Sequence, residues 1–266
     1  MKLKNLLSYL IVSLLAFVFL VPILMLVIMA FKPNTIVTNP LAFGFSLENF
    51  FRLFEMGFGV NIYNSLVIAV ITVFLTTALG TIAGYFSSRF PHGATFYQRF
   101  MFTLRIIPPS AFMIGIFYLV AYQLGGYDTW WGMVLPMTAL QTPLVFLIIK
   151  PFFDGISREL DEAALVDGCS YFQVFTKIIL PVAKNGILVG MFFSFIYTYY
   201  DFATALVVIG SEWKTVTLAL AGLKTQRIIR WGELFAGAFI ATIPIIVISI
   251  IFNKYIIRGL LISTKG

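Results

Sequence analysis

Few residues of this chain could carry out catalysis. Cys169 is the only cysteine and His92 the only histidine among 266 residues, so the sequence has neither a disulfide framework nor the clustered ligands of a metal site. It also contains no Gly-x4-Gly-Lys-Ser/Thr loop, the pattern that cradles the phosphates of ATP. The sequence therefore predicts no cofactor, no metal and no enzymatic activity in this chain.

One polar tripeptide stands inside an apolar stretch. Tyr199, Tyr200 and Asp201 lie within the apolar residues from Gly186 to Ile209. A sugar is commonly bound by an aromatic face against its ring and by acceptor groups at its rim, and this tripeptide has both. We therefore expect it to line or border a substrate pathway. The alternative is that Asp201 pairs with another subunit or caps a local helix break while the tyrosines pack.

A second pattern lies in the polar connection from Asp154 to Lys184. Ser157 is a helix N-cap with carboxylates in the turn after it, and Gly168 suits the left-handed position that ends a helix. Ser170-x-x-Gln173 has the spacing of a capping box, and Pro181 ends that helix or opens the next. The pattern predicts two short amphipathic helices set at an angle to each other.

The elements that hold these residues are membrane spans. The chain is 60% hydrophobic and only 11% charged, too apolar for a soluble domain, and its apolar runs reach the length of a transmembrane helix. We predict one all-α polytopic membrane domain over residues 1–266, with a retained first helix, since the first apolar run is too long for a signal peptide. The six predicted spans are Leu6–Phe31, Ile62–Ser87, Phe100–Leu124, Trp131–Phe153, Gly186–Ile209 and Leu234–Phe252.

The charge distribution predicts the orientation. Twelve of the 18 Lys and Arg residues fall on the side of Lys2 and Lys4, which makes that side cytoplasmic, with both termini and the 154–184 connection on it. The last outer loop, residues 210–232, is unusually cationic for its side. The net charge of +7 is spread singly between spans rather than gathered into a stripe, which argues against nucleic acid as a partner.

The 154–184 connection also carries a recognisable motif. Glu162-Ala163-Ala164, Gly168, Ile178 and Leu180-Pro181 stand at the spacing of the "EAA" loop of bacterial ABC import permeases, which this segment resembles. The likeness extends along the chain to the carbohydrate (maltose-type) permease family. It rests on segments 64–66, 83–85, 128–129, 143–144 and 202–206, on Arg89 and on the ending from Arg258 to Gly266.

The chain departs from that family at one point. Where the family usually has Trp-Asn-Glu-Phe, this sequence has Tyr199-Tyr200-Asp201-Phe202. The departure leaves the identity of the transported solute open. A non-sugar solute, such as a polyol, glycerol phosphate, polyamine or amino acid, is therefore the main alternative to a sugar or oligosaccharide. An ion-driven carrier or a membrane scaffold is the remaining one.

The resemblance implies a working assembly in a bacterial-type cytoplasmic membrane. It comprises this chain, a homologous second permease, two cytoplasmic ATPase subunits that bind ATP and Mg, and an external solute-binding protein. ATP-driven alternating access would carry the solute inward. We expect the outer loops, Pro33–Asn61 and Ser211–Gly232, to face the binding protein.

The motif also implies how ATP hydrolysis is coupled to transport. On this hypothesis Ala163 and Ala164 allow close packing on an ATPase, Phe172 and Phe175 anchor the contact, and Glu162 pairs or caps across it. Leu180 and Pro181 complete the motif shortly before span five. The docked helices would then move spans four and five. The alternative is an amphipathic pair lying on the bilayer surface.

Overall fold

The computed structural model describes residues 2–39, 42–90, 94–106, 108, 111, 113–224 and 229–263. These residues are helical apart from their connections and a single bridge between Lys224 and Ile229. In chain order the helices are α1 (Lys2–Ala30), α2 (Glu48–Glu55), α3 (Phe58–Arg89), α4 (Ala94–Ile106), α5 (Met113–Ile116), the π-helix η2 (Phe117–Gln123), α6 (Trp130–Asp154), α7 (Arg158–Val166), α8 (Tyr171–Gln173), the π-helix η3 (Val174–Ile179), α9 (Leu180–Tyr199), α10 (Ala203–Val208), α11 (Val216–Gly222) and α12 (Trp231–Ser263).

Five helices of the described part of the chain are long and apolar enough to cross a membrane. They cover Ser8–Ala30, Phe58–Arg89, Trp130–Asp154, Tyr171–Tyr199 and Trp231–Tyr255. Each overlaps one of the spans predicted from hydropathy. The all-helical membrane fold is therefore confirmed, whereas the count of six spans is not.

The predicted third span, Phe100–Leu124, is wrong as a single helix. Helix α4 ends at Ile106 and α5 begins only at Met113, and α5 is followed at once by the π-helix η2. Pro108 lies at this break, next to a second proline whose own structure is outside the described residues. A proline has no N–H to donate and pushes the preceding residue out of the helical region.

The chain forms two compact units, and the first comprises residues 1–62 and 219–244. Its centre is aromatic: the ring centroid of Phe31 lies 4.8 Å from that of Phe50 and 5.7 Å from that of Phe239. The amide of Asn49 donates to the carbonyl of Lys32 at 2.7 Å. These contacts hold α2 to the end of α1. Most of α1 exposes apolar side chains, which suits a helix in contact with lipid.

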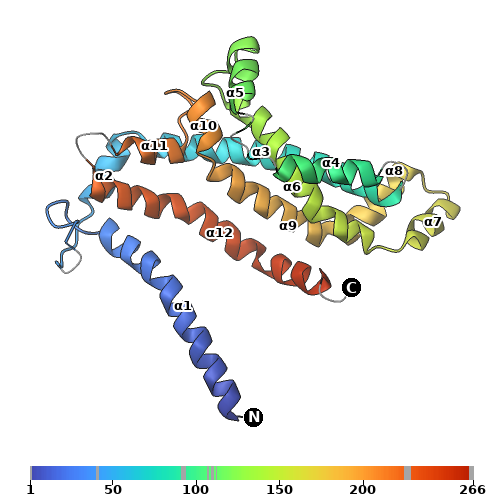
Figure 1. The fold of residues 1–266 in the computed structure, drawn as a ribbon, viewed down its shortest axis with the longest axis horizontal. Coiled ribbons are helices and arrows are strands. Elements are labelled where there is room, and N and C mark those ends of the chain that lie inside the picture. Colours follow the sequence, from blue (N-terminus) through green and yellow to red (C-terminus); the bar gives the residue numbers. More distant parts are fainter. Residues whose placement is uncertain are drawn as a thin grey trace. The chain divides into compact units, whose positions relative to one another are not determined.

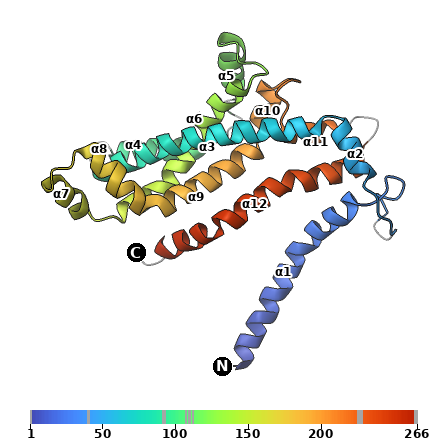
Figure 2. The same ribbon diagram turned by 180° about the vertical axis from the view of Figure 1, so that it is seen from behind.

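The second unit comprises residues 63–218 and 245–266. Within it α3, α6 and α9 run side by side, with α4 against α6 (Figures 1 and 2). Gly80 of α3 and Gly190 of α9 allow both helices to approach α6. A Cβ on Gly80 would lie 2.8 Å from a methyl group of Val145, and one on Gly190 would lie 2.9 Å from Ile149. Small residues at helix contacts are typical of membrane bundles.

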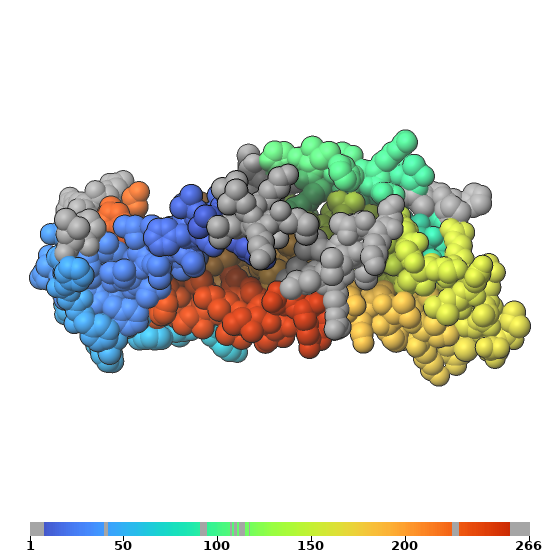
Figure 3. All heavy atoms as spheres, turned by 90° about the horizontal axis from the view of Figure 1, so that it is seen from below, coloured from blue at the N-terminus to red at the C-terminus, as the bar shows by residue number. Residues whose placement is uncertain are grey.

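Helices α7 and α8 lie at one end of this bundle, and α10 lies at the other (Figures 1 and 2). Figure 3 shows α7, in yellow, at that end of the unit, beside the first turns of the helix that continues into α9. A buried apolar cluster supports each end. The cluster at the α7 end comprises Tyr85, Val145, Ile149, Phe153, Ala164, Val174, Ile179 and Ala183. The one at the α10 end comprises Ile68, Met133, Val134, Met137, Ala205 and Ile209.

Candidate functional site

Helix α7 begins and ends at the residues that the sequence predicts. The Oγ of Ser157 accepts a hydrogen bond from the N–H of Glu159 at 3.3 Å. At the other end Gly168 has a φ of +86°. Its N–H donates to Leu165, and the N–H of Cys169 donates to Ala164 at 3.0 Å, which together form a Schellman end. Glycine is favoured at Gly168 because a side chain disfavours this left-handed conformation.

The capping box at the start of the second helix is present as predicted. The N–H of Ser170 donates to Oε1 of Gln173 at 2.9 Å, and the N–H of Gln173 donates back to Oγ of Ser170. Of the two roles predicted for Pro181, the structure shows the second, because Pro181 lies in the first turn of α9 and does not end the helix. Helix α8 continues through η3 into α9 as one helix from Tyr171 to Tyr199. Pro181 has no backbone N–H to donate to the preceding turn of an α-helix. The preceding turn, η3, is a π-helix, and this wider turn accommodates the proline.

The motif residues do not all face outward. Glu162 and Ala163 are exposed on α7, and Gly168 is exposed in the turn after it. Phe172 is 74% exposed, and Pro181 is also exposed. These five residues form the accessible part of the motif.

Ala164 is buried within its own chain, and Phe175 and Leu180 are only partly exposed, so the accessible part of the motif is smaller than the predicted docking face. Ala164 is only 5% exposed and belongs to the apolar cluster of this end. Phe175 is half-buried, with its ring centroid 4.8 Å from that of Tyr85, and Leu180 is also half-buried. The π-turn explains part of the difference, because it changes the spacing at which side chains return to one face. The remaining part is packing against α3, which is distant in the sequence.

Sequence reasoning missed one charged pair in this region. Arg89, at the last turn of α3, lies 2.9 Å from Asp161 of α7, and both side chains are nearly buried. From the sequence, Arg89 was interpreted as an orientation marker and as part of the family resemblance, and Asp161 as a carboxylate favoured by the helix dipole. A signal that could have pointed to this pair is that Asp161 directly precedes the Glu162-Ala163-Ala164 motif and that Arg89 lies shortly after the segment 83–85.

The tripeptide that was expected to line the pathway lies at a helix break. Helix α9 ends at Tyr199 and α10 begins at Ala203, so the predicted single span from Gly186 to Ile209 is wrong. Tyr199 is buried, with its ring stacked at 5.5 Å on Phe195, whereas Tyr200 is 45% exposed. Tyr199 therefore packs within its own chain, and a substrate could meet only Tyr200 and Asp201 in this conformation.

Asp201 is a helix cap in this structure. Its Oδ2 accepts the N–H groups of Thr204 at 2.9 Å and of Ala205 at 3.2 Å, which are donors of the first turn of α10. The hydroxyl of Thr217 donates to the carbonyl of Asp201 at 2.9 Å. The alternative that Asp201 caps a local break is thus correct, and the half-buried carboxylate keeps an oxygen, Oδ1, that these bonds do not use.

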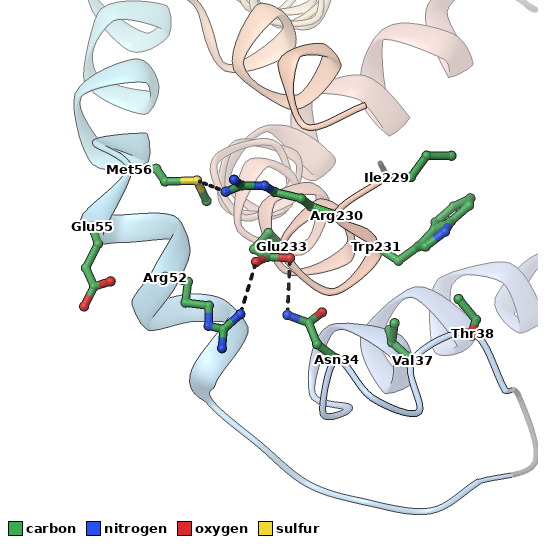
Figure 4. Close-up of a pocket in the computed structure, with 10 residues that line it drawn as sticks. All are labelled: Asn34, Val37, Thr38, Arg52, Glu55, Met56, Ile229, Arg230, Trp231 and Glu233. Atoms are coloured by element: carbon green, nitrogen blue, oxygen red, sulfur yellow. Dashed lines mark hydrogen bonds and ion pairs between the residues drawn. The ribbon is translucent and has the colours of Figure 1, made fainter. Parts of the chain in front are cut away.

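The first unit holds a polar pocket of about 570 Å³, lined by residues from the segments 34–38, 52–56 and 229–233 (Figure 4). The carboxylate of Glu233 is 5% exposed at its base, 3.4 Å from the amide of Asn34 and 4.0 Å from Arg52. Arg230 reaches across the pocket, with a nitrogen 3.0 Å from the sulfur of Met56. No carboxylate partner of Arg230 lies among the described residues, so this guanidinium and the exposed Glu55 remain open to a partner.

The family is decided by residues 76–262, which match the model described as the inner membrane component of binding-protein-dependent transport systems. The chain belongs to this permease family. The match covers α7, the capping box and Asp201. It confirms the resemblance predicted from the EAA-type spacing.

Known members are similar over almost the whole chain. A maltodextrin transport system permease of Bacillus subtilis is 29% identical over 99% of this chain and 97% of that protein. An osmoprotective compounds uptake permease of Synechocystis is 31% identical over 92% of this chain and 87% of that protein. The fold matches a chain of a bacterial ABC transporter that imports the polysaccharide alginate, with a TM-score of 0.80, 18% identity and 96% of each chain covered.

In this permease Asp128 fastens the connection between α10 and α11. Its carboxylate accepts hydrogen bonds from the N–H groups of Ser211 at 2.8 Å, Glu212 at 2.9 Å and Trp213 at 3.0 Å. Asp128 itself has a φ of +55°, in the left-handed region. Burial alone would raise the pKa of Asp128, but the N–H groups of residues 210–213 outweigh it and hold the pKa below its ordinary value.

Asp128→Asn is therefore expected to destabilise the permease above about pH 4. Asparagine tolerates the same backbone conformation but accepts fewer hydrogen bonds, at a cost of about 1–2 kcal/mol. Because the folded-state pKa is lowered, the carboxylate stabilises the fold above the unfolded pKa and loses this effect as the pH falls through the folded pKa. Thermal unfolding in detergent should show a midpoint lower by about 2–6 °C at pH 7. Equal midpoints at pH 7 would contradict this role.

Proposed function

We propose that this chain is one of two permeases of an ABC importer that carries a sugar or oligosaccharide into the cytoplasm. The observation that carries the proposal is the family match over a chain whose EAA-type segment forms a capped, exposed helix at the end of a helix bundle. The sugar is supported by the maltodextrin permease, which is similar along its full length. Tyr200 and the half-buried carboxylate of Asp201 would supply an aromatic face and an acceptor.

On this proposal the α7 end of the bundle is cytoplasmic and contacts an ATPase subunit. The surface that would make this contact is the accessible part of the motif: Glu162, Ala163, Gly168 and Phe172, with Pro181 behind them. ATP and Mg would be bound by the ATPase. One such segment offers one attachment, so two ATPases need the second, homologous permease. We further propose that α4 to η2 form the remaining membrane crossing, which gives six spans and two cytoplasmic termini.

A second candidate is a non-sugar solute. It is favoured by the similarity to the osmoprotective compounds permease and by the departure from the family at Tyr199–Phe202. Both candidates share the assembly and the coupling segment. They differ only in the solute that the binding protein delivers.

Uptake by the purified assembly separates these candidates. The permease is co-expressed with its partner permease, ATPase and binding protein, reconstituted in vesicles, and supplied with maltodextrin, a polyol, glycerol phosphate or an amino acid. We expect ATP-dependent uptake of the oligosaccharide. Uptake of another solute alone would replace the sugar by the second candidate, and uptake driven by an ion gradient without ATP would overturn the importer.

The pocket in Figure 4 is proposed to face the binding protein, because its residues come from the two predicted outer segments, Pro33–Asn61 and Ser211–Gly232, and from Glu233 next to the second. Arg230→Glu should then weaken docking of the binding protein about tenfold at low salt, and the difference should shrink as salt rises. Arg99→Glu, which changes the net charge equally on the opposite predicted side, is the control. Docking that is insensitive to salt and to Arg230→Glu would contradict this role.

A further inference from the structure

A buried ion pair joins three helices at the α7 end of the bundle. The Nη2 of Arg89, on α3, lies 2.9 Å from Oδ2 of Asp161, on α7, and the two side chains are 8% and 13% exposed. The hydroxyl of Tyr85 donates to the other oxygen of Asp161 at 3.0 Å. Nη1 of Arg89 also donates to the carbonyl of Phe153, in α6, at 3.3 Å. Arg89 thus contacts α6 and α7 from the end of α3.

Other contacts bring the same two helix ends together. Arg158, in the first turn of α7, donates to the carbonyl of Ser88 at 3.1 Å. Below the ion pair, Tyr85 and Ala164 belong to one apolar cluster. The contact between α3 and α7 therefore has a polar part and an apolar part, and it joins residues that are 76 positions apart in the sequence.

Stability alone is a poor reason for such a pair. Removing two charges from water costs free energy that their attraction only partly offsets, and apolar residues in the same place often stabilise a fold as well or better. Together with the hydrogen bonds from Tyr85 to Asp161 and from Arg89 to Phe153, the pair defines the position of α7 relative to α3 and α6. The pair is therefore better suited to fixing the position of α7 on α3 than to raising the free energy of unfolding.

We propose that Arg89 and Asp161 are positioning residues that make α7 move as one body with α3. The chain itself connects α7 to α6 through residues 155–157 and to the α8–α9 helix through residues 167–170. Helix α3 has no such direct connection to α7, so it is joined to the helix on which an ATPase would dock by the ion pair, the bond from Arg158 to Ser88 and the apolar cluster, and of these the ion pair is the charged contact. This inference rests on the proposed function, and it adds α3 to the two spans that the coupling segment would move.

The proposal is tested by the solute transported per ATP hydrolysed in vesicles that contain the complete assembly. Arg89→Gln and Asp161→Asn should each lower this ratio about tenfold, because each leaves one buried charge without its partner and loosens the contact between α7 and α3. ATP hydrolysis should remain within about twofold of the unaltered assembly, since docking surfaces are unchanged. Lys150→Gln breaks the ion pair between Lys150 and Asp154 at the same end of α6 and should leave the ratio unchanged.

The exchanged pair, Arg89→Asp with Asp161→Arg, should restore at least about half of the lost ratio. An unchanged ratio in both single variants would overturn the proposal. The proposal would also be overturned if uptake and ATP hydrolysis fell in proportion in the single variants and the exchanged pair did not restore them. That result would indicate lost assembly only. ATP-driven uptake by the unaltered assembly is measured first in the same vesicles, and its absence would count against the proposed function instead.

A distance measurement makes the test independent of transport. Spin labels are placed at Val166 of α7 and Phe86 of α3, which are 87% and 54% exposed, in a chain with Cys169→Ser. We expect a narrow distance distribution that stays the same with and without ATP in the unaltered pair, and a broad one in Arg89→Gln. Tyr85→Phe, which removes only the hydroxyl bond to Asp161, should broaden it less. Equal distributions in all of these chains would overturn the proposal.

Discussion

Gly168→Asp is expected to lower ATP-driven uptake by about 30-fold or more, the effect of losing some 2 kcal/mol at a central contact of an interface. The variant should still fold and assemble. A Cβ at Gly168 would meet nothing within 4 Å in its own chain, although the φ of +86° disfavours any side chain. The intrinsic cost is about 1–2 kcal/mol, and aspartate is among the residues that tolerate this conformation best. A larger loss must therefore arise where α7 meets a partner.

The matched control is Gly168→Asn, which has the same shape without the charge. Its uptake should lie between those of the unaltered permease and the aspartate variant, because it imposes the backbone cost but no charge on the interface. Assembly is checked by co-purification of the ATPase. Normal uptake by Gly168→Asp would show that this turn is not part of the coupling surface.

Asp201→Leu is expected to lower uptake by about tenfold or more at low solute concentration. The substitution removes the acceptor for the N–H groups of Thr204 and Ala205, at a cost of about 0.5–2 kcal/mol, and removes the oxygen proposed to meet the solute. Asp201→Asn separates the two roles, because asparagine is an equally good helix cap. We expect it to keep the assembly intact while the KM for uptake rises by about tenfold, the loss of one charge-assisted hydrogen bond.

Tyr200→Ala complements this test. Tyr200 is 45% exposed and packs edge-on at 5.8 Å against Tyr199. Its removal should change solute preference or affinity while the ATPase remains docked. If Asp201→Asn and Tyr200→Ala both leave the KM and the solute preference unchanged, Asp201 is a helix cap only and the pathway lies elsewhere.

The local patterns of the 154–184 segment, each of which spans only a few residues, were read correctly from the sequence. The N-cap at Ser157, the left-handed Gly168 and the box between Ser170 and Gln173 are all of this kind, because each is closed by hydrogen bonds over one helical turn. The apolar spans followed from length and composition. These features place the coupling segment without any knowledge of tertiary structure.

Features that depend on distant parts of the chain could not be predicted in the same way. The burial of Ala164 and Phe175 depends on the position of α3, and the pair between Arg89 and Asp161 joins charges that each have an ordinary local explanation. The break after Tyr199 was missed because its residues are as apolar as a span, and hydropathy does not register a carboxylate that caps the next helix. The misses at Ala164, Phe175 and the Arg89–Asp161 pair reflect tertiary contact, whereas the breaks at Pro108 and after Tyr199 are local and were missed because hydropathy does not register them.

The central claim, that α7 docks on an ATPase, is tested most directly by site-specific cross-linking in the assembled transporter with Cys169→Ser. Cysteines at the exposed Ala163 and Phe172 are compared with one at Ala164, which neighbours Ala163 but is buried within the permease. The account predicts cross-links to the ATPase from Ala163 and Phe172 and none from Ala164. Absence of cross-links from both exposed positions, in an assembly that transports solute, would contradict it.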